Sequence, residues 1–377
     1  MAAPAESRSA PSGVVMRTGT GQRRPQPRDG RVVRTCRLPA GIVAIALLLL
    51  AAPAPTVLAA PSEFRPGSLL VYPLVDSRAM MGRSTTLSIT NTNASRMVSP
   101  VNHFREGDVR AHYFYVEGAA PWGAFDRVEY LTPNDTLTVV ASEHAPDLNQ
   151  GFLIVLAGDP ESERAVTFNY LIGESLLVDV LTGRTTLLPA VPFEALANGQ
   201  PRSNTNHAFT DLNGNGSADL DGLEYETFPG VLYLDRFFQQ SNTLETELIL
   251  VTLLGRDFRV EMDFLIYDNE EDVFSRTFQF LCWTRVRLTD ISQITRSLGG
   301  RATEAQTGWM RLMGRYAVNI LNGAYWRNEG QVPVTLDPPI LGAVLERIMG
   351  PMGMEYGHLL HHSGAQNGNE FPPDTEN

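Results

Sequence analysis

Hydrophobic and polar residues alternate with a period of two in short runs along much of the chain, a pattern that predicts β-strands. In the run 109–116, this alternation places Val109, Ala111, Tyr113 and Tyr115 on one face of a strand. No stretch between residues 68 and 186 sustains the apolar period of a helix. Comparable runs, bounded by Gly, Pro, Asn and Asp, lie at 69–74, 85–90, 136–141, 152–157, 166–172 and 175–180.

Seven short strands over about 120 residues, with turn-forming residues between them, are typical of an immunoglobulin-like β-sandwich. Six segments then have counterparts in the same order further along the chain, which favours an internal duplication. We therefore expect an all-β fold of two tandem immunoglobulin-like β-sandwich domains; two unrelated sandwiches remain the alternative. The paired segments are 68–74 and 231–237, 86–90 and 247–252, 109–118 and 260–268, 125–127 and 274–276, 151–153 and 308–310, and 166–173 and 334–342.

Composition divides the chain further. The segment 198–229 is rich in Asn, Gly, Ser and Asp, as expected of a linker between a first domain at 66–197 and a second at 230–350. The segment 351–377 is rich in Gly, Pro, Asn and His and is expected to be a mobile C-terminal tail.

The N-terminal segment 1–59 has the build of a cleaved signal peptide. Arg31, Arg34 and Arg37 precede twelve apolar or small residues at 41–52, and small residues follow at 59 and 60. A run of that length is too short to cross a bilayer, which needs about 20 residues, so no membrane span is expected in the mature chain. We expect an exported protein located in the periplasm, at the cell surface or outside the cell.

Charge limits the classes of partner. All 30 basic residues are arginines, and the net charge of the whole chain is −12. Removing residues 1–59 leaves 22 arginines against 40 acidic residues, a net charge of about −18. Such a chain repels phosphate backbones, so nucleic acid and anionic membranes are excluded as expected partners. Cys282 is then the only cysteine, so no internal disulfide is expected, and its strand-like surroundings indicate a buried, unreactive thiol.

The linker contains one candidate metal loop, at 211–222. Oxygen-bearing side chains at its positions 1, 3, 5 and 9, with glycine at position 6, match the spacing of an EF-hand calcium loop. The loop resembles the calcium loops of dockerins and thrombospondin type 3 repeats, which implies a structural calcium ion that stiffens the linker. Position 12 is Gly222 in place of the bidentate glutamate, and Asp221 or Glu224 can take over that role. A turn that binds no metal remains the alternative. The expected ligands are Asp211, Asn213, Asn215, Ser217, Asp219 and Asp221.

Other chemistry is less well supported by the pattern. The acidic run 268–272 offers paired carboxylates of the kind used in glycoside hydrolysis, but it falls between two strand runs, where an acidic turn is expected. His358, His361 and His362 could bind zinc or copper, but a solvated histidine cluster is the expectation. The tryptophans are expected in the core, with sugar stacking as the alternative: Trp122, Trp283, Trp309 and Trp326.

These observations contain no assembled catalytic set. The chain resembles exported bacterial β-sandwich proteins, and we expect a non-enzymatic binding or structural protein with a calcium-stiffened linker. Its ligand would be a protein or a glycan, and the sequence does not indicate the oligomeric state. The alternative is a carbohydrate-active enzyme or lectin that uses the acidic run 268–272 together with tryptophan side chains.

Overall fold

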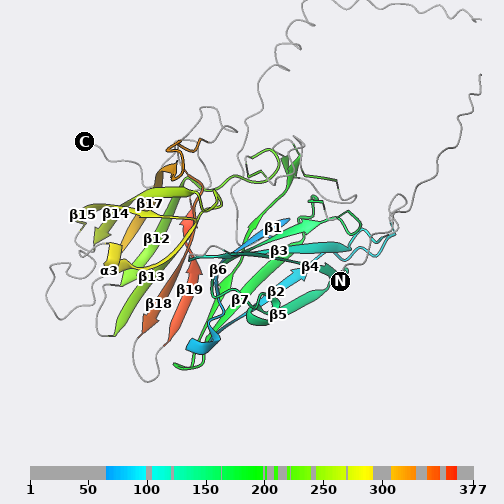
Figure 1. Ribbon diagram of the computed structural model, residues 1–377, viewed down its shortest axis with the longest axis horizontal. Helices are drawn as coiled ribbons and strands as arrows, with labels where there is room; N and C mark the ends of the chain where they lie inside the picture. The colour runs from blue at the N-terminus through cyan, green and yellow to red at the C-terminus, as the bar shows by residue number, and fades with distance from the viewer. Residues whose placement is uncertain are drawn as a thin grey trace, which may run out of the picture. The chain divides into compact units, whose positions relative to one another are not determined.

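The alternating runs fold as strands, and the helices between them, within the part of the chain that the structure describes, are single turns (Figure 1). The computed structural model describes residues 65–98, 104–119, 123–162, 164–197, 200–201, 208–210, 219–220, 222–238, 243–268, 271–291, 307–327, 338–348 and 354–362. All of them lie in one compact unit, Thr56–Asn377. The expected signal peptide lies outside the described residues.

The N-terminal half forms two antiparallel sheets and a short hairpin. Sheet I has the strand order β5-β2-β7-β8 and sheet II the order β4-β3-β6-β1-β9. The elements are β1 (Leu69–Asp76), η1 (Ala79–Met81), β2 (Arg83–Asn91), β3 (Val109–Glu117), β4 (Ala124–Leu131), β5 (Thr136–Val140), α2 (Ala141–His144), β6 (Gln150–Gly158), β7 (Leu171–Asp179), β8 (Arg184–Pro189) and β9 (Val191–Phe193), followed by the hairpin β10 (Leu196–Ala197) and β11 (Gln200–Pro201).

The C-terminal half forms two further antiparallel sheets. Sheet III has the order β16-β13-β18-β19 and sheet IV the order β15-β14-β17-β12-β20. The elements are β12 (Val231–Phe238), β13 (Leu244–Val251), β14 (Phe258–Asp268), β15 (Val273–Phe280), β16 (Trp283–Arg287), α3 (Leu288–Ile291), β17 (Thr307–Asn319), β18 (Leu341–Ile348), β19 (Glu355–Leu359) and β20 (His361–His362).

The two halves repeat one strand order. Sheet I corresponds to sheet III and sheet II to sheet IV, strand for strand, with α2 and α3 at the same place after β5 and β16. A bulge interrupts β1 between Tyr72 and Val75, and another interrupts β12 between Leu234 and Phe237. Within the described residues, the segments paired in the sequence therefore lie on corresponding strands.

Three apolar clusters hold the sheets together. The first lies between sheets I and II and includes Tyr72 and Leu87; another lies between sheets III and IV and includes Leu248 and Phe264. The remaining cluster joins the halves. It packs Leu69, Val71 and Phe152 of sheet II and Leu188 of sheet I against Ile249, Val251, Leu341, Ala343, Leu345 and Leu359 of sheet III.

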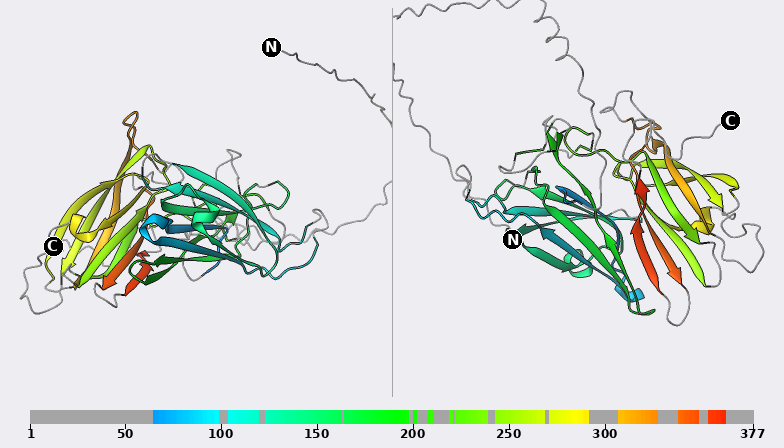
Figure 2. Two further views of the ribbon diagram at one scale, coloured as in Figure 1. Left: turned by 60° about the horizontal axis from the view of Figure 1, so that its bottom comes forward. Right: turned by 180° about the vertical axis from the view of Figure 1, so that it is seen from behind.

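The expectation of two tandem immunoglobulin-like β-sandwich domains is wrong. The fold is all-β, but its four small antiparallel sheets form a four-bladed β-propeller arrangement (Figures 1 and 2). Consecutive strands often belong to different blades, since β1 lies in sheet II and β2 in sheet I. The two-residue period predicts which residues face a core, but it does not predict which sheets share that core.

Burial on both faces marks the strands at the centre of this assembly. Every residue of β1 is buried, as is every residue of β13 after Leu244 and every residue of β18 before Ile348. Close approaches between the halves also require glycine. A Cβ on Gly118 would overlap the Trp283 ring, and a Cβ on Gly357 would overlap Leu188 and Thr186.

Two further findings concern the termini and the membrane. Part of the segment expected to be a C-terminal tail is strand, since β19 pairs with β18 and β20 pairs with β12. None of the helices in the described part of the chain has the length and apolar character needed to cross a membrane.

Candidate functional site

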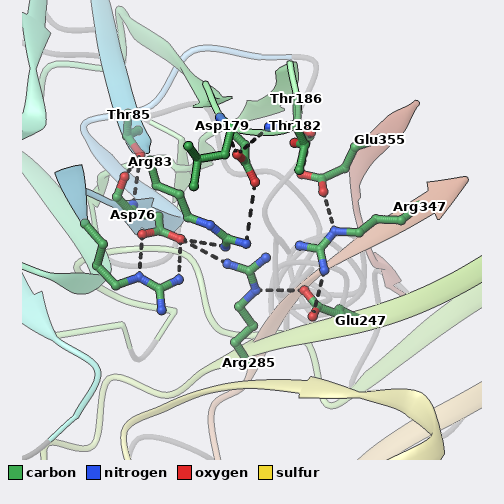
Figure 3. Close-up of polar contacts among 12 residues, drawn as sticks. Asp76, Arg83, Thr85, Asp179, Thr182, Thr186, Glu247, Arg285, Arg347 and Glu355 are labelled. Carbon is green, nitrogen blue, oxygen red and sulfur yellow. Dashed lines mark hydrogen bonds and ion pairs between the residues drawn. The ribbon is translucent and has the colours of Figure 1, made fainter. Parts of the chain in front are cut away.

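The densest group of charged side chains lies where the two halves meet, and Asp76 at the end of β1 is at one end of it (Figure 3). The Asp76 carboxylate accepts hydrogen bonds from Arg78 at 2.8 and 2.6 Å and from Arg83 at 3.0 Å. Arg285, on β16 of the other half, lies 3.1 Å from the same carboxylate. The backbone of Asp76 is fixed as well, because its N–H donates to the Thr85 hydroxyl at 2.8 Å.

Sheet III contributes a row of charges to this group. Glu245 and Glu247 on β13, Arg285 on β16 and Arg347 on β18 occupy the face of the sheet that points toward the N-terminal half. Arg285 Nε lies 2.8 Å from Glu247, and Arg347 Nη1 lies 2.9 Å from the other oxygen of the same carboxylate. Arg347 also contacts Glu245 at 3.3 Å.

These contacts form one continuous string across all four strands of sheet III (Figure 3). From Asp76 it passes through Arg285, Glu247 and Arg347 to Glu355 on β19, whose carboxylate Arg347 Nε contacts directly. Glu355 then accepts a hydrogen bond of 2.7 Å from Thr186 on β8. The string therefore begins and ends in the N-terminal half.

We call this group the ion cluster. Within the described residues it contains five arginines and five carboxylates, so its formal charge is zero. Its members are Arg78, Arg83, Arg285, Arg287, Arg347, Asp76, Asp179, Glu245, Glu247 and Glu355.

Burial and charge act in opposite directions on the carboxylates of the ion cluster. The Asp76 side chain is only 3% exposed, and burial alone would raise its pKa. The hydrogen bonds from Arg78 and Arg83 and the charge of Arg285 outweigh burial and hold the pKa of Asp76 below its ordinary value. Burial likewise acts to raise the pKa of Glu247. The charges of Arg285 and Arg347 outweigh burial and hold the pKa of Glu247 below its ordinary value. Both carboxylates stay ionised at neutral pH and are poorly suited to proton transfer.

Sequence reasoning did not find the ion cluster, although a signal was present. Glu245 and Glu247 are two residues apart in a strand with apolar neighbours, and so are Arg285 and Arg287. Side chains of the same charge at alternate positions lie on one face of a strand. Because β13 is buried on both faces, its two glutamates need cationic partners, and the arginines of the neighbouring strands supply them.

The expected calcium ligands Asp211, Asn213, Asn215, Ser217 and Asp221 lie outside the described residues. Asp219 is described: its carbonyl accepts from the Tyr225 N–H at 3.1 Å, and its N–H donates to Glu224 at 3.3 Å. The Thr210 and Tyr225 hydroxyls lie 3.1 Å apart. Residues on both sides of the loop are thus linked to each other. Among the described residues, no three His, Cys, Asp or Glu side chains lie close enough to hold a metal ion together.

A second buried carboxylate lies just beyond the loop. Glu226 is fully buried, contacts Arg65 directly and accepts the N–H of Glu194 at 2.9 Å. Arg65 also contacts Glu194 at 3.2 Å, so two carboxylates share this guanidinium. Burial, with the nearby charge of Glu194, raises the pKa of Glu226 to about 7 despite the opposing effects of Arg65 and the Glu194 N–H.

The acidic run 268–272 closes the hairpin between β14 and β15. The Asp268 side chain accepts the N–H of Asp272 at 2.9 Å, and Glu271 adopts a positive φ of 67°. Residues 269 and 270 lie outside the described residues. This is the geometry of a turn.

The remaining candidates are mostly structural. Trp283 is buried and donates to the Pro73 carbonyl at 2.9 Å, and Trp326 packs against the cluster between sheets III and IV. Trp309 stacks on Tyr267 with ring centroids 4.0 Å apart, and Trp122 lies outside the described residues. Cys282 is buried as expected, and burial raises the pKa of its thiol to about 11.

The histidines expected in the tail are placed by strands. His358 lies in β19, and His361 in β20 lies 3.9 Å from Asp235. They do not converge on one point with a third ligand among the described residues.

Comparisons with known proteins add little to this picture. No known protein family matches the sequence, and no curated protein matches it. Among solved structures, the chain is similar to Bacteroides uniformis beta-glucuronidase 2 covalently bound to cyclophellitol-6-carboxylate aziridine, with 11% identity and a TM-score of 0.14. The match covers 78% of this chain but only 26% of that protein. A similarity of this size carries no argument about fold or function.

Proposed function

We propose that this chain is an exported, non-enzymatic structural or binding protein whose ion cluster fixes the two halves as one rigid scaffold. The observation that carries this proposal is the composition of the ion cluster. Five arginines and five carboxylates neutralise one another between the halves, and the string of contacts begins and ends in the N-terminal half. A buried network of this kind orients packed elements relative to one another.

The chemistry of the ion cluster supports a scaffold over an enzyme. A general acid or base needs a pKa near the working pH, whereas the pKa values of Asp76 and Glu247 are lowered. Site electrostatics that act on a substrate need charge that is not already neutralised. In the described residues, the acidic hairpin at 268–272 forms a turn, and Cys282 is buried. Glu226 has a pKa of about 7, but it is fully buried and is held by Arg65 and the Glu194 N–H, so it does not face a substrate.

The test uses residues 60–377 in one preparation with two readouts. Aryl glycosides, aryl esters and a fluorogenic peptide library are incubated with the protein at pH 5 and pH 8, and the same protein is applied to a glycan array. We expect no turnover above that of a heat-inactivated sample. Turnover that Glu247→Gln abolishes in a variant that is still folded by circular dichroism would overturn the proposal.

A further inference from the structure

Exposed apolar side chains gather on adjacent turns at one end of the molecule. The short helix η1 presents Met80, which is fully exposed, and Met81. The turn between β7 and β8 presents Val180 and Leu181. The Val180 N–H donates to the Gly82 carbonyl at 2.7 Å, so these two turns lie side by side.

The C-terminal half contributes to the same end, where β18 ends and β19 begins (Figure 1). Ile348 and Met354 are exposed there, and the Ile348 N–H donates to the Met354 carbonyl at 2.8 Å. Glu355, the next residue, accepts a hydrogen bond from Thr186 near the start of β8, which places this connection beside the β7–β8 turn. We call six side chains the apolar end: Met80, Met81, Val180, Leu181, Ile348 and Met354.

Members of the ion cluster hold the bases of these turns. Arg78 and Arg83 lie on either side of η1, and both bind the Asp76 carboxylate. Arg347 contacts Glu355, directly after the exposed Met at the start of β19. Charged groups that neutralise one another therefore lie directly behind the apolar end.

The backbone of the turns is also satisfied within the protein. The Asp179 carboxylate accepts the N–H of Leu181 at 3.1 Å, and the Met81 N–H donates to the Arg78 carbonyl at 2.8 Å. A backbone donor that already has a partner costs little to move out of water, whereas an unpaired one costs several kcal/mol in lipid. An apolar environment therefore suits these turns. Further N–H groups that donate within the protein belong to Ala79, Gly82, Val180 and Thr182.

Two other groups of exposed apolar side chains are less continuous. Ile172 and Leu176, on the outer face of sheet I, are separated along β7 by the exposed Glu174. Ile320 and Leu321 occupy a single turn after β17. Neither group combines turns from both halves, as the apolar end does.

The apolar end fits a lipid surface better than a protein surface. Its side chains are aliphatic or Met, stand on separate turns and include none of the Trp, Tyr or Arg anchors that dominate protein interfaces. Large exposed apolar patches mark protein or membrane contacts, and a fluid bilayer receives separate turns without a matching pocket. The exposed Tyr356, whose hydroxyl lies 3.5 Å from the Met354 sulfur, is of the type enriched at the level of lipid headgroups.

Charge selects the class of lipid. The chain has 42 acidic residues against 30 arginines, so anionic headgroups repel it. The ion cluster behind the apolar end has a formal charge of zero, and the side chains of Arg78 and Arg83 are each 27% exposed. An arginine can keep its stem on apolar surface and direct its guanidinium to a phosphate. A zwitterionic headgroup offers that phosphate without a net negative charge.

We propose that the apolar end inserts into the surface of bilayers made of zwitterionic phospholipid, with Arg78 and Arg83 at the level of the headgroups. The contact is peripheral, because only side chains on turns enter the apolar layer. The proposal deepens the proposed binding function by naming its partner, and it rests on that function because the ion cluster holds the turns in place.

The test is flotation of residues 60–377 with phosphatidylcholine vesicles at up to about 5 mM lipid, because a few side chains bind more weakly than an acyl chain. Met80→Asp and Leu181→Asp should each lower the partition coefficient by about tenfold or more. Met80 is fully exposed, so its variant remains informative if Leu181→Asp does not fold. Phosphatidylglycerol at about a third of the lipid should weaken binding at low salt, and added salt should restore it.

Leu321→Asp is the matched control, because Leu321 and Leu181 are both 76% exposed. Leu321 lies away from the apolar end: it follows the end of β17, whereas β17 begins beside Phe238, and β13, the next strand after Phe238, begins beside Ile348. Ile172→Asp is the control for the outer face of sheet I. Both variants are expected to bind vesicles like wild type.

A wild type that does not float with phosphatidylcholine would overturn the proposal, as would binding that requires phosphatidylglycerol. Binding that Met80→Asp and Leu181→Asp both retain, or that Leu321→Asp or Ile172→Asp abolishes, would place the contact elsewhere and overturn it too. Self-association without lipid that Leu181→Asp abolishes, in a protein that does not float, would assign the apolar end to a protein partner instead. None of these results alters the turnover test, so the two proposals fail independently.

Discussion

At the scale of single residues, the contact between the halves depends on Asp76. Its carboxylate is almost fully buried and is surrounded by Arg78, Arg83 and Arg285. Removing one member of such a group leaves the others buried without a counter-charge, and that penalty exceeds the net contribution of the intact group.

We predict that Asp76→Ala lowers the free energy of unfolding by about 3–5 kcal/mol. Asp179→Asn is the control: its carboxylate is 22% exposed and lies 3.7 Å from Arg83, so a loss within about 1 kcal/mol is expected. Urea unfolding at pH 7 measures both. Equal losses in the two variants would mean that burial of Asp76 has no special role.

The lowered pKa of Asp76 also sets a pH window for this effect. Because the folded state binds the proton less tightly than the unfolded chain, the stability due to ionised Asp76 is present above the unfolded pKa of about 3.9. It is lost as the pH falls through the lower, folded value. The difference between wild type and Asp76→Asn should therefore be constant from pH 5 to 8 and shrink below about pH 4.

Glu226 is expected to act in the opposite direction. Its pKa is raised to about 7, so between the ordinary value of 4.5 and 7 the folded state holds a proton that the unfolded chain has lost. The stability that this gives is present at low pH and is lost as the pH rises through 7. We predict that wild type loses on the order of 2 kcal/mol relative to Glu226→Gln between pH 5 and pH 8. Glu194→Gln removes one cause of the raised pKa and should make this loss smaller. A difference between wild type and Glu226→Gln that stays unchanged across this range would contradict the assignment.

At the scale of elements, the sequence predicts strands well and their packing poorly. The alternation in 109–116 places Val109, Ala111, Tyr113 and Tyr115 on the buried face of β3, as expected. The order of the paired segments also follows the repeated strand order. The grouping of the strands could not be predicted, because β13 and β18 are buried on both faces and carry charges whose partners come from neighbouring strands and the other half.

The same limit applies to the candidate site. Side chains of the same charge at alternate positions, as at Glu245 and Glu247, indicate one charged face of a strand. Asp76, which lies at the other end of the same string of contacts, is about 170 residues away from them in the chain. Contacts at such separations depend on how the sheets pack, which no local pattern encodes. Local patterns did identify the acidic turn at 268–272 and the buried thiol of Cys282.

The close contact between β8 and β19 gives a prediction about one glycine. A methyl group on Gly357 would overlap Leu188 and Thr186, so Gly357→Ala should separate the two edge strands and lower the free energy of unfolding by about 1–3 kcal/mol. A methyl group at Gly123 would meet only the flexible Phe125 ring, so Gly123→Ala is the control and should be nearly neutral. Chemical denaturation compares the two. A neutral Gly357→Ala would show that the Leu188 and Thr186 side chains can move aside without cost.

The loop at 211–222 remains a proposed calcium site, and its test is direct. We predict that 5 mM calcium raises the melting temperature of residues 60–377 relative to the same protein in excess EDTA. Asp211→Ala should abolish the shift, because a hard cation binds weakly once a charged oxygen ligand is removed. Magnesium at the same concentration is the ion control. No shift with calcium in the wild type would identify the loop as a turn that binds no metal.

At the scale of the whole molecule, the apolar cluster that joins the two halves and the ion cluster act together. The apolar cluster brings sheets II and III into contact, and the charged string fixes where they meet. Neither half buries its part of this apolar contact surface alone. Leu69, Val71 and Phe152, for example, are buried by residues of the other half. A half that unfolds would expose this surface on its neighbour, which couples the two halves in unfolding.

This coupling is the central claim, and calorimetry of residues 60–377 at pH 7 tests it most directly, at a concentration where the sample is monomeric. If the halves form one cooperative scaffold, the protein unfolds in a single transition whose calorimetric and van't Hoff enthalpies agree. Two resolved transitions, or a van't Hoff enthalpy near half of the calorimetric one, would show that the halves unfold separately and would contradict the account.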